Sequence, residues 1–117
     1  MRMDAIDFAT LVQNRNAYVA LLKNEAHQIA GRLYALGVEQ VILFGSVARG
    51  SARMHSDLDL AVIWDTPLPR LERTVTLYQR LGALSVPVDL VVLTPTEAIP
   101  ARQTQFTKKI FAQGVKL

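Results

Sequence analysis

The sequence predicts an α/β protein in which a small mixed sheet of three to four strands is flanked by helices. Two short apolar runs support this prediction: Val41–Phe44, which ends at Gly45-Ser46, and Leu58–Ile63, which is headed by Asp57-Leu58-Asp59. The polar groups that end the first run meet those that head the second only if the two strands are antiparallel. The 22 residues of segment 65–86 are enough for the helical crossover that a parallel third strand requires.

The composition is that of a globular protein. We expect the 117 residues, 50% hydrophobic and 20% charged, to form one domain spanning residues 1–117. There is no cysteine, which excludes disulfides and thiolate metal sites and fits a cytoplasmic protein. No apolar run is long enough to cross a membrane, and the first residues lack the apolar region of a signal peptide. The net charge of +3 comes from scattered cations, which argues against nucleic-acid binding through a basic stripe.

The first element is a long helix, expected over residues 4–36. Apolar residues recur in it at the 3.6-residue spacing of a buried helix face, and Gly37 stands where a C-terminal glycine ends a helix. These apolar residues are Leu22, Ala26, Ile29, Leu33 and Leu36. The polar stretch 13–16 divides this helix from an apolar piece at residues 5–12, which packs either on the core or on another chain.

The central elements follow directly. We expect a strand over 38–44, a short helix over 46–50, an exposed polar loop over 51–56, and a second strand over 58–64. The second strand is almost continuously apolar, which predicts that both of its faces are covered.

The last part of the chain is expected to add a helix, a strand and a further helix. Leu71, Val75, Tyr78 and Leu81 mark one apolar face of a helix that ends near Gly82, and a third strand covers 86–93. Thr94-Pro95-Thr96-Glu97 matches a capping box with proline at the first helical position, so a helix is predicted to begin there, with Pro100 delaying or bending it. Its buried side is predicted to carry Phe106, Ile110 and Phe111, and residues 115–117 to run along the sheet after Gly114.

Asp57 and Asp59 are the candidate metal ligands. Alternate residues of a strand share a face about 6.5–7 Å apart, and carboxylates in an apolar strand need a compensating charge, which a divalent cation would provide. On the first strand, Gly45 removes the Cβ where a phosphate approaches the backbone, and Ser46 offers a hydroxyl and an N–H at a helix start. Taken alone, Asp57 is also consistent with an ordinary turn or strand-start residue without a metal-binding role.

The spacing of these groups resembles that of a known superfamily. Gly45-Ser46-Val47-Ala48-Arg49-Gly50, followed by Asp57-Leu58-Asp59 with ten residues between Ser46 and Asp57, is similar to the nucleotidyltransferases that include DNA polymerase beta. More narrowly, it resembles the minimal nucleotidyltransferases known as MNT proteins. The matching motifs cover residues 38–93, and the resemblance implies the nucleotidyltransferase fold.

The resemblance also implies a mechanism. A third carboxylate on the neighbouring strand completes the metal site in this superfamily, and Asp89 is the candidate here; otherwise it is an edge-strand charge. Three carboxylates would hold two Mg²⁺ ions, with Mn²⁺ as an alternative. Gly45, Ser46, Arg49 and Arg53 would bind the phosphates of the nucleotide, and the reaction would move AMP from ATP to a hydroxyl.

The acceptor is expected to lie outside this domain, because only 24 residues follow the third strand. Small MNT proteins resemble antitoxins whose partner is a helical HEPN ribonuclease toxin, and the resemblance implies transfer of AMP to a tyrosine of such a partner. Two other interpretations stay open. One is a binding protein that neutralises its partner by contact alone, and the other is a transferase acting on a small molecule such as an antibiotic, with a homodimer completing the site.

Overall fold

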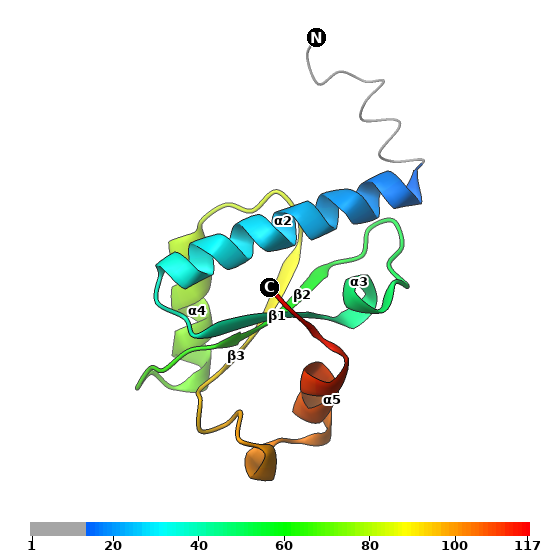
Figure 1. Cartoon of the computed structure of the whole chain (residues 1–117). Helices are drawn as coiled ribbons and strands as arrows, with labels where there is room; N and C mark the ends of the chain where they lie inside the picture. The colour runs from blue at the N-terminus through cyan, green and yellow to red at the C-terminus, as the bar shows by residue number, and fades with distance from the viewer. Residues whose placement is uncertain (1–13) are drawn as a thin grey trace.

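The computed structural model describes residues 14–117, which form a four-stranded mixed sheet with helices on both faces (Figure 1). The strand order is β3-β2-β1-β4. The elements in chain order are α2 (Arg15–Ala35), β1 (Gln40–Phe44), α3 (Gly45–Arg49), β2 (Leu58–Ile63), α4 (Arg70–Leu81), β3 (Val88–Leu93), a 3-10 turn (Pro100–Arg102), α5 (Gln105–Gln113) and β4 (Val115–Lys116).

The strand directions are those that the sequence predicts. β1 is antiparallel to β2, and β2 is parallel to β3 with α4 as the crossover between them. β4 pairs antiparallel with β1, which confirms the predicted extension of residues 115–117 along the sheet. The strands β1 and β3 each begin two residues later than predicted, at Gln40 and Val88.

The larger core lies on the face of the sheet that α2 and α4 cover. Leu58, Leu60 and Val62 of β2 point to this side and are fully buried there. The helices contribute Leu22, Ala26, Ile29, Ala30 and Leu33 from α2 and Leu77 and Leu81 from α4. The opposite face has a smaller core, in which Ile110 of α5 packs on Ile42 and Ala61. Both faces of β2 are therefore covered, as its composition predicts.

Both ends of α2 are set by local sequence. The Asn14 side chain accepts a hydrogen bond from the Ala17 amide (3.1 Å), so Asn14 is the N-cap and α2 begins at the polar stretch that divides the predicted helix. At the other end, Gly37 adopts a φ of 99°, and its amide and that of Val38 donate to the carbonyls of Tyr34 and Leu33. This is a Schellman motif. The predicted helix over residues 4–13, and the apolar piece at 5–12, lie outside the described residues.

The predicted apolar face of α4 is right at its C-terminal end, where Leu81 is buried and Tyr78 is half-buried against the core, and wrong at its N-terminal end. Leu71 and Val75 are 75% and 44% exposed, whereas Arg73 is buried together with Leu77. Arg73 reaches into the structure because its guanidinium donates to the carbonyls of Leu68 and Val92 and forms an ion pair with Glu97 (2.6 Å). These partners satisfy the charge that burial would otherwise penalise.

The capping box at Thr94 forms, but no helix follows it. The Thr94 amide and the Glu97 amide donate reciprocally to each other's side chains, and a single turn follows. Pro100 has no N–H to continue the ladder and holds Ile99 in an extended conformation (φ −60°, ψ 133°). The helix begins instead at Gln105, behind a second capping box formed by Thr104 and Thr107.

Of the predicted buried side of α5, Ile110 is buried and Phe111 is half-buried, but Phe106 is 54% exposed. The Phe106 ring meets Phe44, at the end of β1, edge to face with the ring centroids 5.9 Å apart. No helix within residues 14–117 combines the length and the hydropathy needed to cross a membrane.

Candidate active site

Asp59 lies near the start of β2, the strand that has β1 on one side and β3 on the other. In the antiparallel pair it is opposite Phe44, the last residue of β1, and in the parallel pair it is beside Asp89 of β3. Asp57 precedes Asp59 by two residues, and adjacent strands lie about 4.8 Å apart. The sheet therefore brings Asp57, Asp59 and Asp89 to one end, next to the Gly45-Ser46 turn.

Gly45 lies against the Asp59 carboxyl group. A Cβ at position 45 would be 2.9 Å from Cγ of Asp59 and would overlap its Oδ2. Gly45 also adopts a φ of 75°, a conformation that other residues adopt only under strain. Glycine is thus required here twice: for the backbone conformation that starts α3, and for the space that the carboxyl group occupies.

The electrostatics of Asp59 agree with this crowding. Burial raises the pKa of Asp59 above its ordinary value, and the negative charges of Asp89 and Asp57 raise it further, whereas Arg49 of α3 lowers it. Two further carboxylates and one arginine therefore act electrostatically on Asp59.

The donor set fits a hard divalent cation that is shared with a bound substrate. Within residues 14–117, no three acidic, histidine or cysteine side chains lie close enough together to form a complete metal cage. Mg²⁺ is ordinarily held by one or two carboxylates together with substrate phosphates and water. Asp59, with Asp57 or Asp89 beside it, offers such a partial set.

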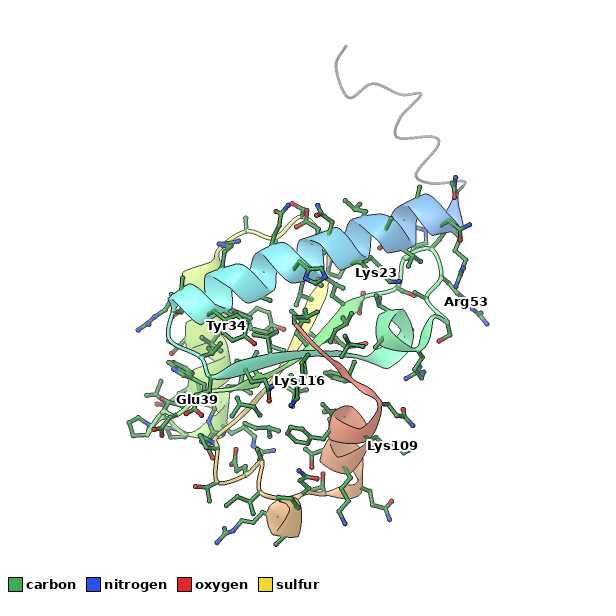
Figure 2. The ribbon with its side chains drawn as sticks, in the orientation of Figure 1. Lys23, Tyr34, Glu39, Arg53, Lys109 and Lys116 are labelled. Carbon is green, nitrogen blue, oxygen red and sulfur yellow. The ribbon has the colours of Figure 1, made fainter. Side chains whose placement is uncertain are left out.

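The predicted phosphate-binding residues are not all near the carboxylates. Ser46 follows Gly45 directly in α3, and Arg49 affects the pKa of Asp59. Arg53, by contrast, lies in the loop between α3 and β2, where it is exposed and extends outward (Figure 2). Arg53 is not among the groups that shift the pKa of Asp59, so the structure brings Arg49 to the site and leaves Arg53 at its margin.

The loop between α3 and β2 is anchored by residues that the sequence did not single out. The Arg15 side chain donates to the carbonyls of Ala52 (2.6 Å) and Gly50 (3.0 Å), and the Tyr18 hydroxyl donates to the carbonyl of Ser56 (3.1 Å). Ala52 is fully buried, so the prediction of a wholly exposed loop is wrong. The N-terminal turn of α2 therefore holds the connection between Ser46 and Asp57.

Comparison with known protein families identifies the family of the chain. The profile of the family described as "Polymerase beta, Nucleotidyltransferase" matches residues 27–117. Among curated proteins, the chain is similar to spectinomycin 9-adenylyltransferase of Staphylococcus aureus, including strains Mu50 and N315, with 30% identity over 90 residues. The match covers 68% of this chain and 35% of the relative, so the chain spans about a third of the length of the curated relatives it matches.

Three solved structures share the fold. A Sulfolobus solfataricus protein assigned as a nucleotidyltransferase aligns with a TM-score of 0.61 at 20% identity, over 84% of this chain and 80% of its own. A protein assigned as a minimal nucleotidyltransferase aligns with a TM-score of 0.53 at 26% identity, over 85% and 95%. A chain of a mutant toxin–antitoxin MntA-HpeT aligns with a TM-score of 0.50 at 28% identity, over 81% and 70%. With the profile match over residues 27–117, the chain belongs to the polymerase beta nucleotidyltransferase family.

Proposed function

We propose that this protein transfers AMP from ATP to a hydroxyl group on a partner protein, as the antitoxin of a toxin–antitoxin pair. The observation that carries the transferase activity is the position of Asp59, which lies beside Asp89 in register and against the backbone of Gly45. That arrangement places carboxylates next to the Gly45-Ser46 turn, where Ser46 and the amides that follow it would hold the phosphates. Transfer from ATP implies a cytoplasmic setting.

Each residue of the site has a role in this proposal. Asp57, Asp59 and Asp89 would hold two Mg²⁺ ions, which when bound neutralise phosphate charge and stabilise the attacking and leaving oxygens. Ser46 and Arg49 would bind the phosphates of ATP, with Arg53 at the margin. Asp89, exposed at the end of the sheet, would accept the proton of the acceptor hydroxyl.

Two similarities support a protein acceptor. One of the structural relatives is part of the toxin–antitoxin MntA-HpeT, at 28% identity. Another is assigned as a minimal nucleotidyltransferase, and the similarity extends over 95% of that chain. The proposed partner is a helical HEPN-type toxin that presents a tyrosine, serine or threonine hydroxyl. Docking of a folded partner would supply the proximity and orientation that the transfer step requires.

A second candidate is transfer of AMP to a small hydroxylated compound. It is favoured by the 30% identity to spectinomycin 9-adenylyltransferase. A homodimer of this chain would then complete the acceptor pocket.

The test is incubation of the purified chain with labelled ATP, Mg²⁺ and the toxin-like protein encoded beside it, followed by mass spectrometry of that protein. We expect an added AMP on a hydroxyl side chain, lost with Asp57→Ala and retained with Asp65→Asn. Asp65 is a suitable control because it is an exposed aspartate just beyond the other end of β2.

Two other outcomes would contradict the proposal. A tight complex without a mass change, in wild type and Asp57→Ala alike, would indicate a protein that neutralises its partner by contact alone. Turnover of spectinomycin or a related aminocyclitol, with the neighbouring protein unmodified, would indicate the small-molecule transferase.

A further inference from the structure

A cavity of about 140 Å³ lies between α3 and α5, beside the candidate active site. Gly45 and Arg49 line it from α3 and Phe44 from β1, while Phe106, Lys109, Ile110 and Gln113 line it from α5. Gly45 forms the boundary between this cavity and the carboxyl group of Asp59. A ligand that extends past Gly45 from Asp59 would therefore enter the cavity.

α5 presents one fixed face to this cavity. Phe106, Lys109, Ile110 and Gln113 recur at the i, i+3, i+4, i+7 spacing of a single helix face. Ile110 anchors the helix in the smaller core, and the Phe106 ring contacts Phe44. Behind the helix, β4 pairs with β1. The backbone position of Lys109 is thus set by packing on both sides, although its side chain is exposed (Figure 2).

The cavity carries positive charge without a compensating acid. Among the described residues that line it, Arg49 and Lys109 are cationic and none is acidic. The ion pairs found within residues 14–117 join Arg70 and Arg73 to Glu97, so neither cavity cation is ion-paired there. Arg49 acts on Asp59, whereas Lys109 extends from the opposite side of the cavity, on α5. The charge of Lys109 is consequently available to a bound anion.

Resting on the proposed function, we propose that this cavity binds the pyrophosphate portion of the nucleoside triphosphate, and that Lys109 is a phosphate-binding residue. In the transfer step, the acceptor oxygen forms a bond to the α-phosphorus, and the bond from that phosphorus to the oxygen bridging to the β-phosphorus breaks. The electron pair of the broken bond stays on the departing pyrophosphate, and the proton of the acceptor hydroxyl passes to Asp89. Lys109 and Arg49 offset the negative charge of the leaving group.

The chain provides a matched control in Lys108, which is equally exposed on α5 but does not line the cavity. We would measure the binding of ATP, AMP and inorganic pyrophosphate to the full chain by calorimetry, with and without Mg²⁺. Because hydrogen bonds to charged groups are the stronger ones, Lys109→Ala is expected to weaken the binding of ATP and pyrophosphate about tenfold and to leave AMP binding unchanged. Lys109→Arg should restore most of the affinity, and Lys108→Ala should match wild type.

The alternatives separate clearly. Unchanged ATP and pyrophosphate binding in a folded Lys109→Ala chain would overturn this inference and leave the proposed transferase intact. Equal weakening of AMP and ATP would also overturn it, by placing Lys109 against the nucleoside. A wild-type chain that binds no triphosphate would overturn the proposed function itself.

Discussion

Gly45 and Asp59 lie so close together that an added Cβ on the glycine would be 2.9 Å from Cγ of the aspartate. Gly45 directly follows the last residue of β1 and Asp59 lies at the start of β2, and the antiparallel register of the two strands brings them together. This contact links the turn that would bind phosphate to the carboxylate that would bind metal. A change at either residue therefore affects both halves of the site.

Gly45→Ala tests this link. The alanine would carry the strain of a positive φ, roughly 1–2 kcal/mol, and would also displace the Asp59 carboxyl group. Since a misplacement of about 1 Å at a reacting centre can cost roughly a hundredfold, we expect nucleotidyl transfer to fall by about that factor. Steady-state kinetics and thermal denaturation would measure the two effects.

The matched control is Gly50→Ala. Gly50 has nearly the same φ, 76°, but nothing lies within 4 Å of an added Cβ there. It should share the loss of stability and keep most of the activity. Equal loss of activity in the two variants would show that backbone strain, rather than contact with Asp59, accounts for the effect.

Asp59→Asn should separate stability from activity. The pKa of Asp59 is raised by burial and by Asp89 and Asp57, so the ionised carboxylate destabilises the fold above its folded-state pKa. Asparagine removes that cost. Because solvent screens a half-exposed group, we expect a gain at pH 7 of at most about 1 kcal/mol, or about 4 °C in Tm, in the presence of a chelator.

The gain in stability of Asp59→Asn should depend on pH, because it comes from removing the ionised carboxylate. Well below the ordinary value of 3.8, the carboxyl is protonated in both the folded and the unfolded states, so the difference between variant and wild type should disappear there. Activity should fall at least about a hundredfold at every pH, since the variant loses charge stabilisation. A lower Tm for Asp59→Asn at pH 7 would contradict the crowding of charge that we describe.

The end of the sheet that carries the candidate site could be predicted because its information is local. Gly45-Ser46 and Asp57-x-Asp59 are short motifs, and the 22 residues of segment 65–86 are enough for the helical crossover that a parallel β3 requires. The resemblance to the nucleotidyltransferases then indicates Asp89, on the strand beside Asp59, as the third carboxylate. Their catalytic and metal-binding roles stay predictions.

The packing of α4 could not be predicted from its pattern. Periodicity favours the face with Leu71 and Val75, yet Arg73 is buried because its partners Leu68, Val92 and Glu97 surround it. Two of these partners lie 19 and 24 positions away. A long side chain with an apolar stem and a satisfied charge can take a core position that hydropathy assigns to an aliphatic residue.

The same limit applies to the loop between α3 and β2. Arg15, which anchors this loop, is 37 positions from Ala52 in the sequence. In the sequence alone, the stretch 13–16 indicates only a polar break in the predicted N-terminal helix. The single turn after Thr94 shows a different limit, because a correct capping box does not guarantee a helix when Pro100 follows six residues later.

Arg15→Ala should loosen the loop that joins Ser46 to Asp57. It removes two hydrogen bonds from a charged donor, to Ala52 and Gly50, at a cost of roughly 1–3 kcal/mol. Hydrogen exchange of the amides in residues 51–57 should become faster, and transfer activity should fall by about three- to tenfold.

Tyr18→Phe is the smaller version of the same change, because it removes one neutral hydrogen bond to Ser56 (3.1 Å). We expect a cost of about 1 kcal/mol and faster exchange confined to the Ser56 side of the loop. Unchanged exchange in both variants would mean that the loop is held by the burial of Ala52 alone.

Glu97→Gln should make the fold less stable at neutral pH and less sensitive to acid. Burial alone would raise the pKa of Glu97, but hydrogen bonds from the Thr94 amide and the Arg73 guanidinium, with the charges of Arg73 and Arg70, lower it below its ordinary value of 4.5. A carboxyl with a lowered folded-state pKa contributes stability that is present above pH 4.5 and is lost as the pH falls through the folded-state value.

Glutamine leaves the buried Arg73 without a charged partner, so we expect a loss of roughly 1–3 kcal/mol at pH 7 that shrinks toward zero below the folded-state pKa. Denaturant titrations of wild type and variant between pH 3 and pH 7 would measure this difference, and a constant difference across that range would show that the ionisation of Glu97 does not stabilise the fold. Arg70→Ala is the control, because its contact with Glu97 is longer, at 3.4 Å, and exposed, and it should change the stability by only a few tenths of a kcal/mol.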